Sequence, residues 1–202
     1  IMGFETTDDA AYIIFSFNMI GLGLFIGMLL YAVATQRDVP TIRLVDGNVL
    51  PDLTLKKDNK FHIFLSHVWS SGQDQVATIK RQLQLLVPGV SVFLDVDDLE
   101  DVSQLENYIA QSQLVLVFLS KSYFFSKNCL RELDHALALK KPIVLVHEAD
   151  LSHGGAPLDV ILAECESRGR TAVFDAGGEI YTWQRIAEFQ LCVLRQIAGR
   201  ML

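Results

Sequence analysis

Two kinds of hydrophobic pattern divide the chain. Residues 11–34 form a run of 24 residues without a charged side chain, whereas from residue 61 onward short apolar runs alternate with segments whose apolar positions recur every three or four residues. An uncharged run of this length can cross a bilayer as a tilted helix, and the second pattern is typical of an α/β domain. We therefore expect residues 1–10 to be an extracytosolic flank, 11–34 a transmembrane helix, 35–60 a juxtamembrane linker and 61–202 a folded domain.

The charges beside the apolar run indicate its orientation. Three acidic residues and no lysine or arginine precede the run, whereas Arg37 and Arg43 follow it. The positive-inside rule then puts the folded domain in the cytosol. A cleaved signal peptide is the alternative, because Ala32 to Ala34 has the small-x-small pattern of a cleavage site, but the acidic flank and the length of the run oppose it.

The periodicity of the folded domain predicts five strands, each followed by a helix. The strands are expected at 62–66, 90–94, 114–119, 142–146 and 171–174, and the helices around 76–86, 102–110, 130–137, 158–165 and 183–197. Repeated β-then-α units give a parallel sheet with helices on both faces, because a parallel crossover needs a helix. We therefore predict an α/β, flavodoxin-like sheet of five parallel strands in the order 2-1-3-4-5.

That strand order predicts where a ligand would bind. In such sheets the crevice lies at the switch point, here between the carboxyl ends of the first and third strands, which are Ser66 and Ser120. His67, Trp69 and Asp74 follow the first strand, so we expect them to face this crevice. The acidic loop 95–101 would lie at its side.

One glutamate stands near the start of the helix that follows the third strand. Leu130, Leu133 and Leu137 form an apolar stripe that can pack on the sheet, and this spacing directs Glu132 away from it. Ser126 or Asn128 can cap this helix. A structural role for Glu132 is a surface acid that the helix dipole favours by about 0.3–1 kcal/mol. A catalytic role needs a further signal.

Composition narrows the functional classes. The net charge of −7 argues against nucleic acid as a partner, because phosphate contacts need a basic surface. The three cysteines, Cys129, Cys165 and Cys192, are widely spaced, so they indicate neither a disulfide framework nor a zinc site. We assign no metal and no cofactor.

Three segments of the domain resemble the Toll/interleukin receptor (TIR) family. FHIFLSHVWSSGQDQ (61–75) is similar to its first strand and following loop, FLDVDDLEDVSQLENYI (93–109) to its second strand, BB loop and second helix, and SKSYFFSKNCLREL (120–133) to a later loop and helix. Plant members carry Ser-Lys-x-Tyr followed by Trp-Cys-Leu-x-Glu-Leu in that last segment. Asn128 replaces the tryptophan here, and the resemblance extends from residue 61 to about 197.

The resemblance implies an activity and a mode of assembly. Enzymatic TIR domains hydrolyse NAD⁺ with the glutamate that matches Glu132, and TIR domains assemble through the BB loop, with copies of themselves or with other TIR proteins. NAD⁺ is then a substrate and not a cofactor. Residues expected to contact it are Ser66, His67, Trp69, Asp74, Ser120, Tyr123 and Cys129, and the expected self-association residues are Asp95, Asp97, Asp98, Leu99 and Glu100.

Two alternatives stay open. A non-enzymatic TIR adaptor has the same fold, and fold alone does not decide activity. The segment VFLDVDDL also resembles the Asp-x-Asp signature of haloacid dehalogenase phosphatases, with Asp95 as nucleophile and Asp97 as acid. That signature normally ends the first, central strand, whereas here another strand precedes it.

Overall fold

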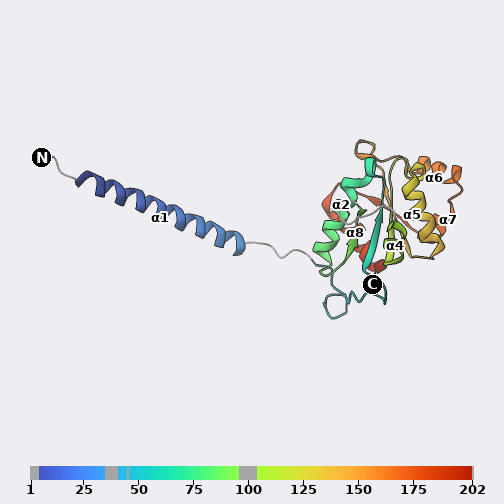
Figure 1. Cartoon of the computed structure of the whole chain (residues 1–202), viewed down its shortest axis with the longest axis horizontal. Coiled ribbons are helices and arrows are strands. Elements are labelled where there is room, and N and C mark those ends of the chain that lie inside the picture. The colour runs from blue at the N-terminus through green and yellow to red at the C-terminus, as the bar shows by residue number, and fades with distance from the viewer. Residues whose placement is uncertain (1–4, 35–40, 45, 96–103, 202) are drawn as a thin grey trace. The chain divides into compact units, whose positions relative to one another are not determined.

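The computed structural model describes residues 5–34, 41–44, 46–95 and 104–201, and the chain divides between residues 39 and 40 into two compact units. The first unit contains one helix, α1 (Glu5–Ala34). Within it, Ala10–Ala34 is long and apolar enough to cross a membrane. The helix predicted from the uncharged run is therefore present (Figure 1).

The second unit is built on a five-stranded parallel sheet. Its strands are β1 (Phe61–Ser66), β2 (Val92–Phe93), β3 (Ser112–Leu119), β4 (Ile143–Glu148) and β5 (Ile180–Trp183). They lie in the order β2-β1-β3-β4-β5, and every neighbouring pair is parallel. The predicted α/β class and the order 2-1-3-4-5 are confirmed.

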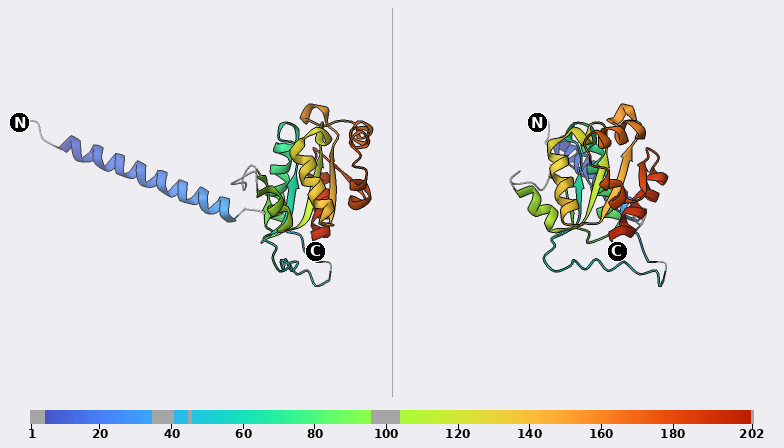
Figure 2. Two further views of the ribbon diagram at one scale, coloured as in Figure 1. Left: turned by 45° about the vertical axis from the view of Figure 1, so that its right-hand side comes forward. Right: turned by 90° about the vertical axis from the view of Figure 1, so that its right-hand side faces the viewer.

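Helices cover both faces of this sheet. α2 (Trp69–Leu86) and α8 (Ala187–Met201) pack on one face (Figure 1, Figure 2). The other face is covered by α4 (Leu105–Ala110), α5 (Lys127–Ala138), α6 (Leu158–Ser167) and α7 (Ala172–Gly177). Two short 3₁₀ helices, η2 (Tyr123–Phe125) and η3 (Leu151–His153), follow β3 and β4.

The strand β3 shows why its apolar run is continuous. Leu114, Leu116 and Phe118 belong to the hydrophobic layer under α2 and α8. The residues between them, Val115 and Val117, belong to the layer on the opposite face. Because successive side chains point to opposite faces of a strand, a sheet buried on both faces needs apolar residues at every position.

The fifth strand is not where the sequence predicted it. Thr171 is the N-cap residue of the helix α7 and residues 172–174 begin it, whereas β5 lies at Ile180–Trp183, so the closing helix starts at Ala187 and not at Trp183. Val173 is buried and Phe174 packs beside it in the layer under α5. A short apolar run cannot be assigned to strand or buried helix by periodicity alone, and here tertiary packing selects the helix.

Part of the segment predicted as a linker packs along the domain. The amide of Ile42 donates to the carbonyl of Leu86 at 2.7 Å, and the ring Nε2 of His62 lies 2.9 Å from the carbonyl oxygen of Leu53. The side chains of Ile42 and Leu53 contact the hydrophobic layer under α2 and α8. This contact extends the folded unit beyond its predicted start at Phe61.

Candidate functional site

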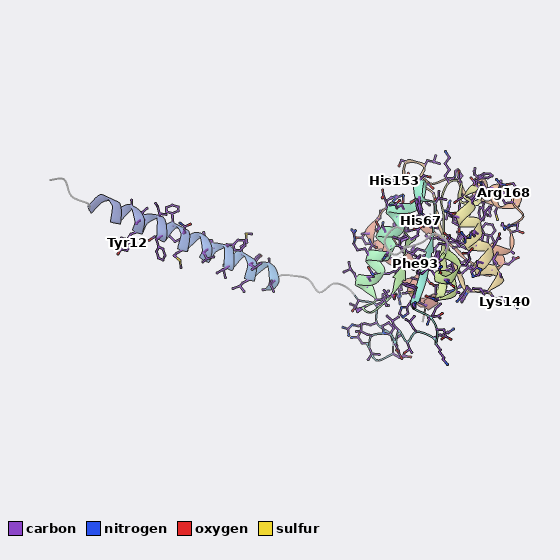
Figure 3. All side chains as sticks on the ribbon, viewed as in Figure 1. Tyr12, His67, Phe93, Lys140, His153 and Arg168 are labelled. Atoms are coloured by element: carbon purple, nitrogen blue, oxygen red, sulfur yellow. The ribbon has the colours of Figure 1, made fainter. Side chains whose placement is uncertain are left out.

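The carboxyl ends of β1 and β3 lie side by side. Leu65 pairs with Leu116 and Ser66 with Val117, at the centre of the sheet where the chain order reverses. His67 and His153 lie toward one end of the domain, whereas Lys140 lies toward the other (Figure 3). Open α/β sheets place ligands at such a switch point, beyond the carboxyl ends of the strands.

Helix α5 directs Glu132 toward these strand ends. The helix begins at Lys127, and the side chain of Ser126 caps it by accepting a hydrogen bond from the amide of Cys129. Its buried positions are Cys129, Glu132, Leu133 and Ala136, which follow the i, i+3, i+4, i+7 spacing of one helix face. Glu132 is therefore on the buried stripe in the second helical turn and only 4% exposed, not directed away from the sheet as the leucine spacing predicted.

Glu132 belongs to a buried chain of hydrogen bonds. The hydroxyl of Ser66 donates to Glu132 Oε2 at 2.5 Å. The hydroxyl of Tyr123 lies 2.6 Å from the same Ser66 oxygen, and since Ser66 gives its proton to Glu132, Tyr123 is the donor in this second bond. Strand β1, the loop after β3 and helix α5 thus meet at the carboxyl group.

Burial determines the protonation of Glu132. Loss of water around the carboxylate raises the pKa of Glu132 to about 8, and the negative charge of Asp95 adds to the rise. The Ser66 hydrogen bond acts in the opposite direction, since it stabilises the ionised form. The carboxyl group is therefore largely protonated at neutral pH, and a positive charge placed beside it would ionise it.

A pocket of about 220 Å³ opens beside this carboxyl group. Its size suits one ring of a ligand, because pockets for whole drug-sized ligands start near ~300 Å³. The described residues that line it include no lysine or arginine. They are His67, Val68, Trp69, Ser70, Ser126, Asn128 and Glu132.

Asp95 forms another part of this region. The sequence assigned Asp95 to the self-association loop, but the residue is only 9% exposed and its carboxylate accepts a hydrogen bond from the indole nitrogen of Trp69. Its second oxygen lies 3.8 Å from Nδ1 of His67. The other predicted loop residues, Asp97, Asp98, Leu99 and Glu100, lie outside the described part of the chain.

The remaining residues predicted to contact a ligand fall into two groups. Cys129 lies near the pocket, where its thiol donates to the carbonyl of His67 at 3.2 Å and burial raises the pKa of Cys129 to about 12. Ser120 is buried, and its hydroxyl oxygen lies 2.9 Å from the hydroxyl oxygen of Ser71. Asp74 is exposed on α2. Asp74 lines a neighbouring cavity of about 490 Å³, which shares Trp69 and Ser70 with the Glu132 pocket, and neither Asp74 nor Ser120 lines the pocket itself.

The aromatic residues after β3 mainly fill space. Tyr123 and Phe124 are fully buried, and their rings meet edge to face at 5.2 Å. Phe125 is half exposed, and the guanidinium of Arg168 lies over its ring. None of these three rings lines the Glu132 pocket. Among the described residues that do line it, Trp69 supplies the large aromatic ring.

Two features of the site were not predicted from the sequence. The contact between Asp95 and Trp69 joins residues 26 positions apart, and no local pattern indicates it. The buried position of Glu132 was detectable, because a stripe that starts at Cys129 includes it.

The position of Asp95 argues against the phosphatase alternative. Asp95 follows β2, and β2 is an edge strand of the sheet, whereas the phosphatase signature ends the central strand.

Comparisons with known proteins agree with this architecture. A search of curated protein sequences finds no match. One similar solved structure contains the TIR domains of the activated Roq1 resistosome, which directly recognises the pathogen effector XopQ. The sequence identity is 21% and the TM-score is 0.50, and the match covers 69% of this chain and 98% of that chain. A metazoan TIR-STING receptor from C. gigas in complex with 2′,3′-cGAMP is 14% identical with a TM-score of 0.50, over 75% of this chain and 42% of that chain.

A third similar structure is the TIR domain of the Toll-related receptor TRR-2 from Hydra magnipapillata, at 11% identity and a TM-score of 0.46, over 70% of this chain and 98% of that chain. At these identities, the two matches with a TM-score of 0.50 show the fold alone. The sequence match is more specific, because the family model described as TIR domain matches residues 63–169, which is more than half of the chain. The chain therefore belongs to the TIR domain family.

Proposed function

We propose that this TIR domain signals from a membrane by self-association and that it hydrolyses NAD⁺, with Glu132 as the catalytic residue. The observation that carries the proposal is the position of Glu132. It is a buried carboxyl group, hydrogen-bonded by Ser66, on a ring-sized pocket beside the switch point of the sheet.

The chemistry requires only one carboxylate. The nicotinamide ring of NAD⁺ is already cationic, so it departs with the electron pair of the broken bond between its ring nitrogen and C1′ of the ribose, without a general acid. The ribose then carries the developing positive charge of an oxocarbenium ion. An ionised Glu132 stabilises that charge most effectively in a pocket from which water is excluded. A water oxygen bonds to C1′ and releases a proton, which gives ADP-ribose and nicotinamide.

The raised pKa of Glu132 fits this mechanism. Without a positive charge beside it, the carboxyl group of Glu132 keeps its proton at neutral pH, because burial raises its pKa to about 8. The cationic nicotinamide ring favours the ionised form, since an opposite charge nearby lowers the pKa of a carboxyl group. Binding of NAD⁺ is then coupled to loss of the Glu132 proton, and the carboxylate forms when the substrate is present to use it.

The other residues around the pocket have supporting roles. Ser66 orients the carboxyl group of Glu132, and Tyr123 orients Ser66. Trp69 offers an aromatic face to the nicotinamide ring, an arrangement that favours a cation. His67 lines the same pocket and is 3% exposed.

Membrane attachment and assembly complete the proposal. Residues 11–34 anchor the chain, and the basic residues that follow them put the domain on the cytosolic side. A resistosome is an assembly, and its TIR domains share this fold. We place self-association at the loop that contains Asp97, Asp98, Leu99 and Glu100.

One observation favours a non-enzymatic adaptor as the second candidate. The pocket of about 220 Å³ holds a ring but not a dinucleotide, so most of NAD⁺ would lie outside it. An adaptor needs no pocket, and it would tolerate replacement of Glu132 while changes in the self-association loop abolish signalling.

The deciding experiment measures nicotinamide release from NAD⁺ by the full chain, crowded in lipid vesicles. Glu132→Gln keeps the shape of the side chain and an acceptor for Ser66, and Glu188→Gln changes an exposed glutamate on α8 as the matched control. We expect Glu132→Gln to lower release by about 100-fold or more, because the charge that stabilises the transition state is lost. Equal release by both variants excludes Glu132 as the catalytic residue, and no release by the folded, clustered native chain favours the adaptor.

A further inference from the structure

We propose that Asp95 is a positioning residue, which fixes the indole of Trp69 on the Glu132 pocket and makes this pocket select a positively charged aromatic ring. The inference rests on the proposed function, because it names the part of the substrate that the pocket recognises. It assigns Asp95 a role in the pocket in place of the role at a self-association surface that the sequence predicted.

The first step is the geometry of the indole. Trp69 is the first residue of α2 and is 55% exposed, so few packing contacts restrict its ring. Its Nε1–H donates to Oδ2 of Asp95, a carboxylate that is itself almost buried after the end of β2. A charge-assisted hydrogen bond of this kind is stronger than a neutral one. Asp95 therefore determines the orientation in which Trp69 lines the pocket.

The second step is the charge of the pocket. The described lining residues include no lysine or arginine, whereas Glu132 is one of them and Asp95 contacts two others, Trp69 and His67. His67 adds no positive charge at neutral pH, because burial lowers its pKa. A cation over an aromatic face and close to a carboxylate is favoured twice, by the ring quadrupole and by the opposite charge. A neutral ring of the same shape has neither advantage.

The third step is an unsatisfied group in the same wall. Among the described residues, neither ring nitrogen of the buried His67 has a hydrogen-bond partner, although Asp95 is within ion-pair range of Nδ1. A buried polar group without a partner is costly, so its presence points to a ligand that satisfies it. A neutral imidazole carries its donor and its acceptor on opposite sides of the ring, so one of the two can pair with a polar group of a ligand. The ligand class is therefore a positively charged aromatic ring that carries a polar substituent.

The test compares two small probes that differ in charge. 1-Methylnicotinamide is the cationic ring with its carboxamide, and nicotinamide is the neutral ring. Their dissociation constants are measured by titration calorimetry with the full chain in detergent micelles, so no catalytic turnover is needed. We expect the native chain to bind the cation on the order of tenfold more tightly than the neutral ring.

Two variants separate charge from position. Asp95→Asn keeps an oxygen that can accept from the indole but removes one negative charge, so the preference for the cation should fall, and the part that remains comes from Trp69 and Glu132, while nicotinamide binding is unchanged. Trp69→Phe keeps a ring but removes the bond to Asp95, so both probes should bind more weakly. Asp159→Asn, an exposed aspartate at the start of α6, is the matched control and should change neither constant.

The position of the indole has its own readout. The chain contains two tryptophans, so nitrogen-15 labelling of tryptophan gives two indole N–H signals, and Trp69→Phe identifies that of Trp69. Asp95→Asn should shift this signal upfield because its hydrogen bond weakens, and the unchanged Trp183 signal confirms that the chain is folded.

The outcomes distinguish this inference from the proposed function. Equal binding of the two probes by the native chain, or an unchanged cation preference in Asp95→Asn, overturns the inference even if NAD⁺ is hydrolysed. A cation preference that falls in Asp95→Asn but not in Asp159→Asn supports it even if the chain releases no nicotinamide, in which case only the hydrolase proposal fails.

Discussion

The hydroxyl of Ser66 donates a 2.5 Å hydrogen bond to Oε2 of Glu132, which joins the end of β1 to the second turn of α5. The two residues are 66 positions apart in the chain. The bond stabilises the ionised form of a carboxyl group whose burial favours the protonated form. Ser66 therefore moderates the cost of the charge that the proposed reaction uses.

Removing this hydroxyl should change the pH dependence of the reaction. In Ser66→Ala the carboxylate loses a donor, so the pKa of Glu132 rises further and half-maximal NAD⁺ cleavage moves to higher pH. The free energy of unfolding should also fall by about 1–3 kcal/mol, because the hydroxyl of Tyr123 loses its partner. Profiles of kcat/KM against pH and urea denaturation check the two effects.

Tyr123→Phe is the matched variant for this prediction. It removes the hydroxyl that contacts Ser66 but leaves the bond between Ser66 and Glu132, so its pH profile should shift less than that of Ser66→Ala. A native profile in Ser66→Ala would mean that Ser66 does not act on Glu132 in the working enzyme.

The free energy of unfolding should decrease as the pH rises from 4.5 to about 8, because Glu132 has different pKa values in the unfolded and folded chain. Its pKa is raised from 4.5 to about 8, so between these values the folded chain keeps a proton that the unfolded chain releases. The free energy of unfolding then falls with pH, by at most about 1.4 kcal/mol per pH unit from this group. Below pH 4.5 both states hold the proton and this contribution is constant.

The measurement is denaturation of the native chain and of Glu132→Gln between pH 5 and pH 8.5. All other titrating groups are present in both chains. The difference between their free energies of unfolding, plotted against pH, therefore reports the titration of Glu132 alone. We expect Glu132→Gln to gain stability relative to the native chain as pH rises. A constant difference across this range would show that Glu132 titrates alike in the folded and unfolded chains.

A second buried carboxylate should depend on its arginine. The side chain of Glu148 is completely buried, accepts from the amide of Asp150 at 2.9 Å and pairs with Arg185. In Arg185→Met the carboxylate loses its counter-charge, and the free energy of unfolding should fall by about 3–5 kcal/mol. Thermal denaturation measures the loss.

Two further variants test whether the effect comes from the unpaired charge. Adding Glu148→Gln to Arg185→Met should recover part of the lost stability, because the buried group is then neutral. Arg131→Met breaks a surface pair with Glu106 and should cost about 1 kcal/mol or less. Equal losses in Arg185→Met and Arg131→Met would contradict the burial argument.

The turn after η3 should tolerate only glycine at position 155. A Cβ on Gly155 would lie 2.4 Å from the carbonyl oxygen of Glu148 and 2.7 Å from that of Asp150, both backbone atoms. Gly155→Ala therefore forces the backbone to move and should destabilise the fold by more than 1 kcal/mol, at the scale of overpacking in a core. Chemical denaturation gives the value.

Gly199→Ala is the contrasting variant. A Cβ at Gly199 meets no atom within 4 Å, and this glycine lies inside the helix α8. Alanine should stabilise the chain there by about 0.5–1 kcal/mol, because glycine is a poor helix former. If Gly155→Ala were as stable as Gly199→Ala, the backbone of Gly155 would not lie as close to the carbonyl oxygen of Glu148 as the structure places it.

The sequence could predict those features that depend on local pattern. The uncharged run predicted α1, because its length and apolar character are properties of consecutive residues. The repeated strand-then-helix order predicted the parallel sheet and its strand order, since few connections of such units are possible. The short run at 171–174 gave the wrong element, because four apolar residues fit a strand and a buried helix equally well.

In the candidate site, too, local sequence pattern predicted only those features that depend on neighbouring residues. Ser126 was one of two predicted caps, with Asn128, and Ser66 was predicted as the end of a strand, because both features depend on neighbouring residues in the sequence. The leucine stripe predicted an outward Glu132, and only packing of α5 on the strand ends shows that the buried stripe runs through it.

The sequence by itself determined the elements, their order around the sheet and the end of the sheet where the candidate residues gather, because periodicity and connection rules operate along the chain. Tertiary structure alone decided the bond from Ser66 to Glu132 and the contact of Asp95 with Trp69. Those partners lie 66 and 26 positions apart, and such contacts, like the pKa that burial gives Glu132, depend on how side chains meet after the helices pack on the sheet.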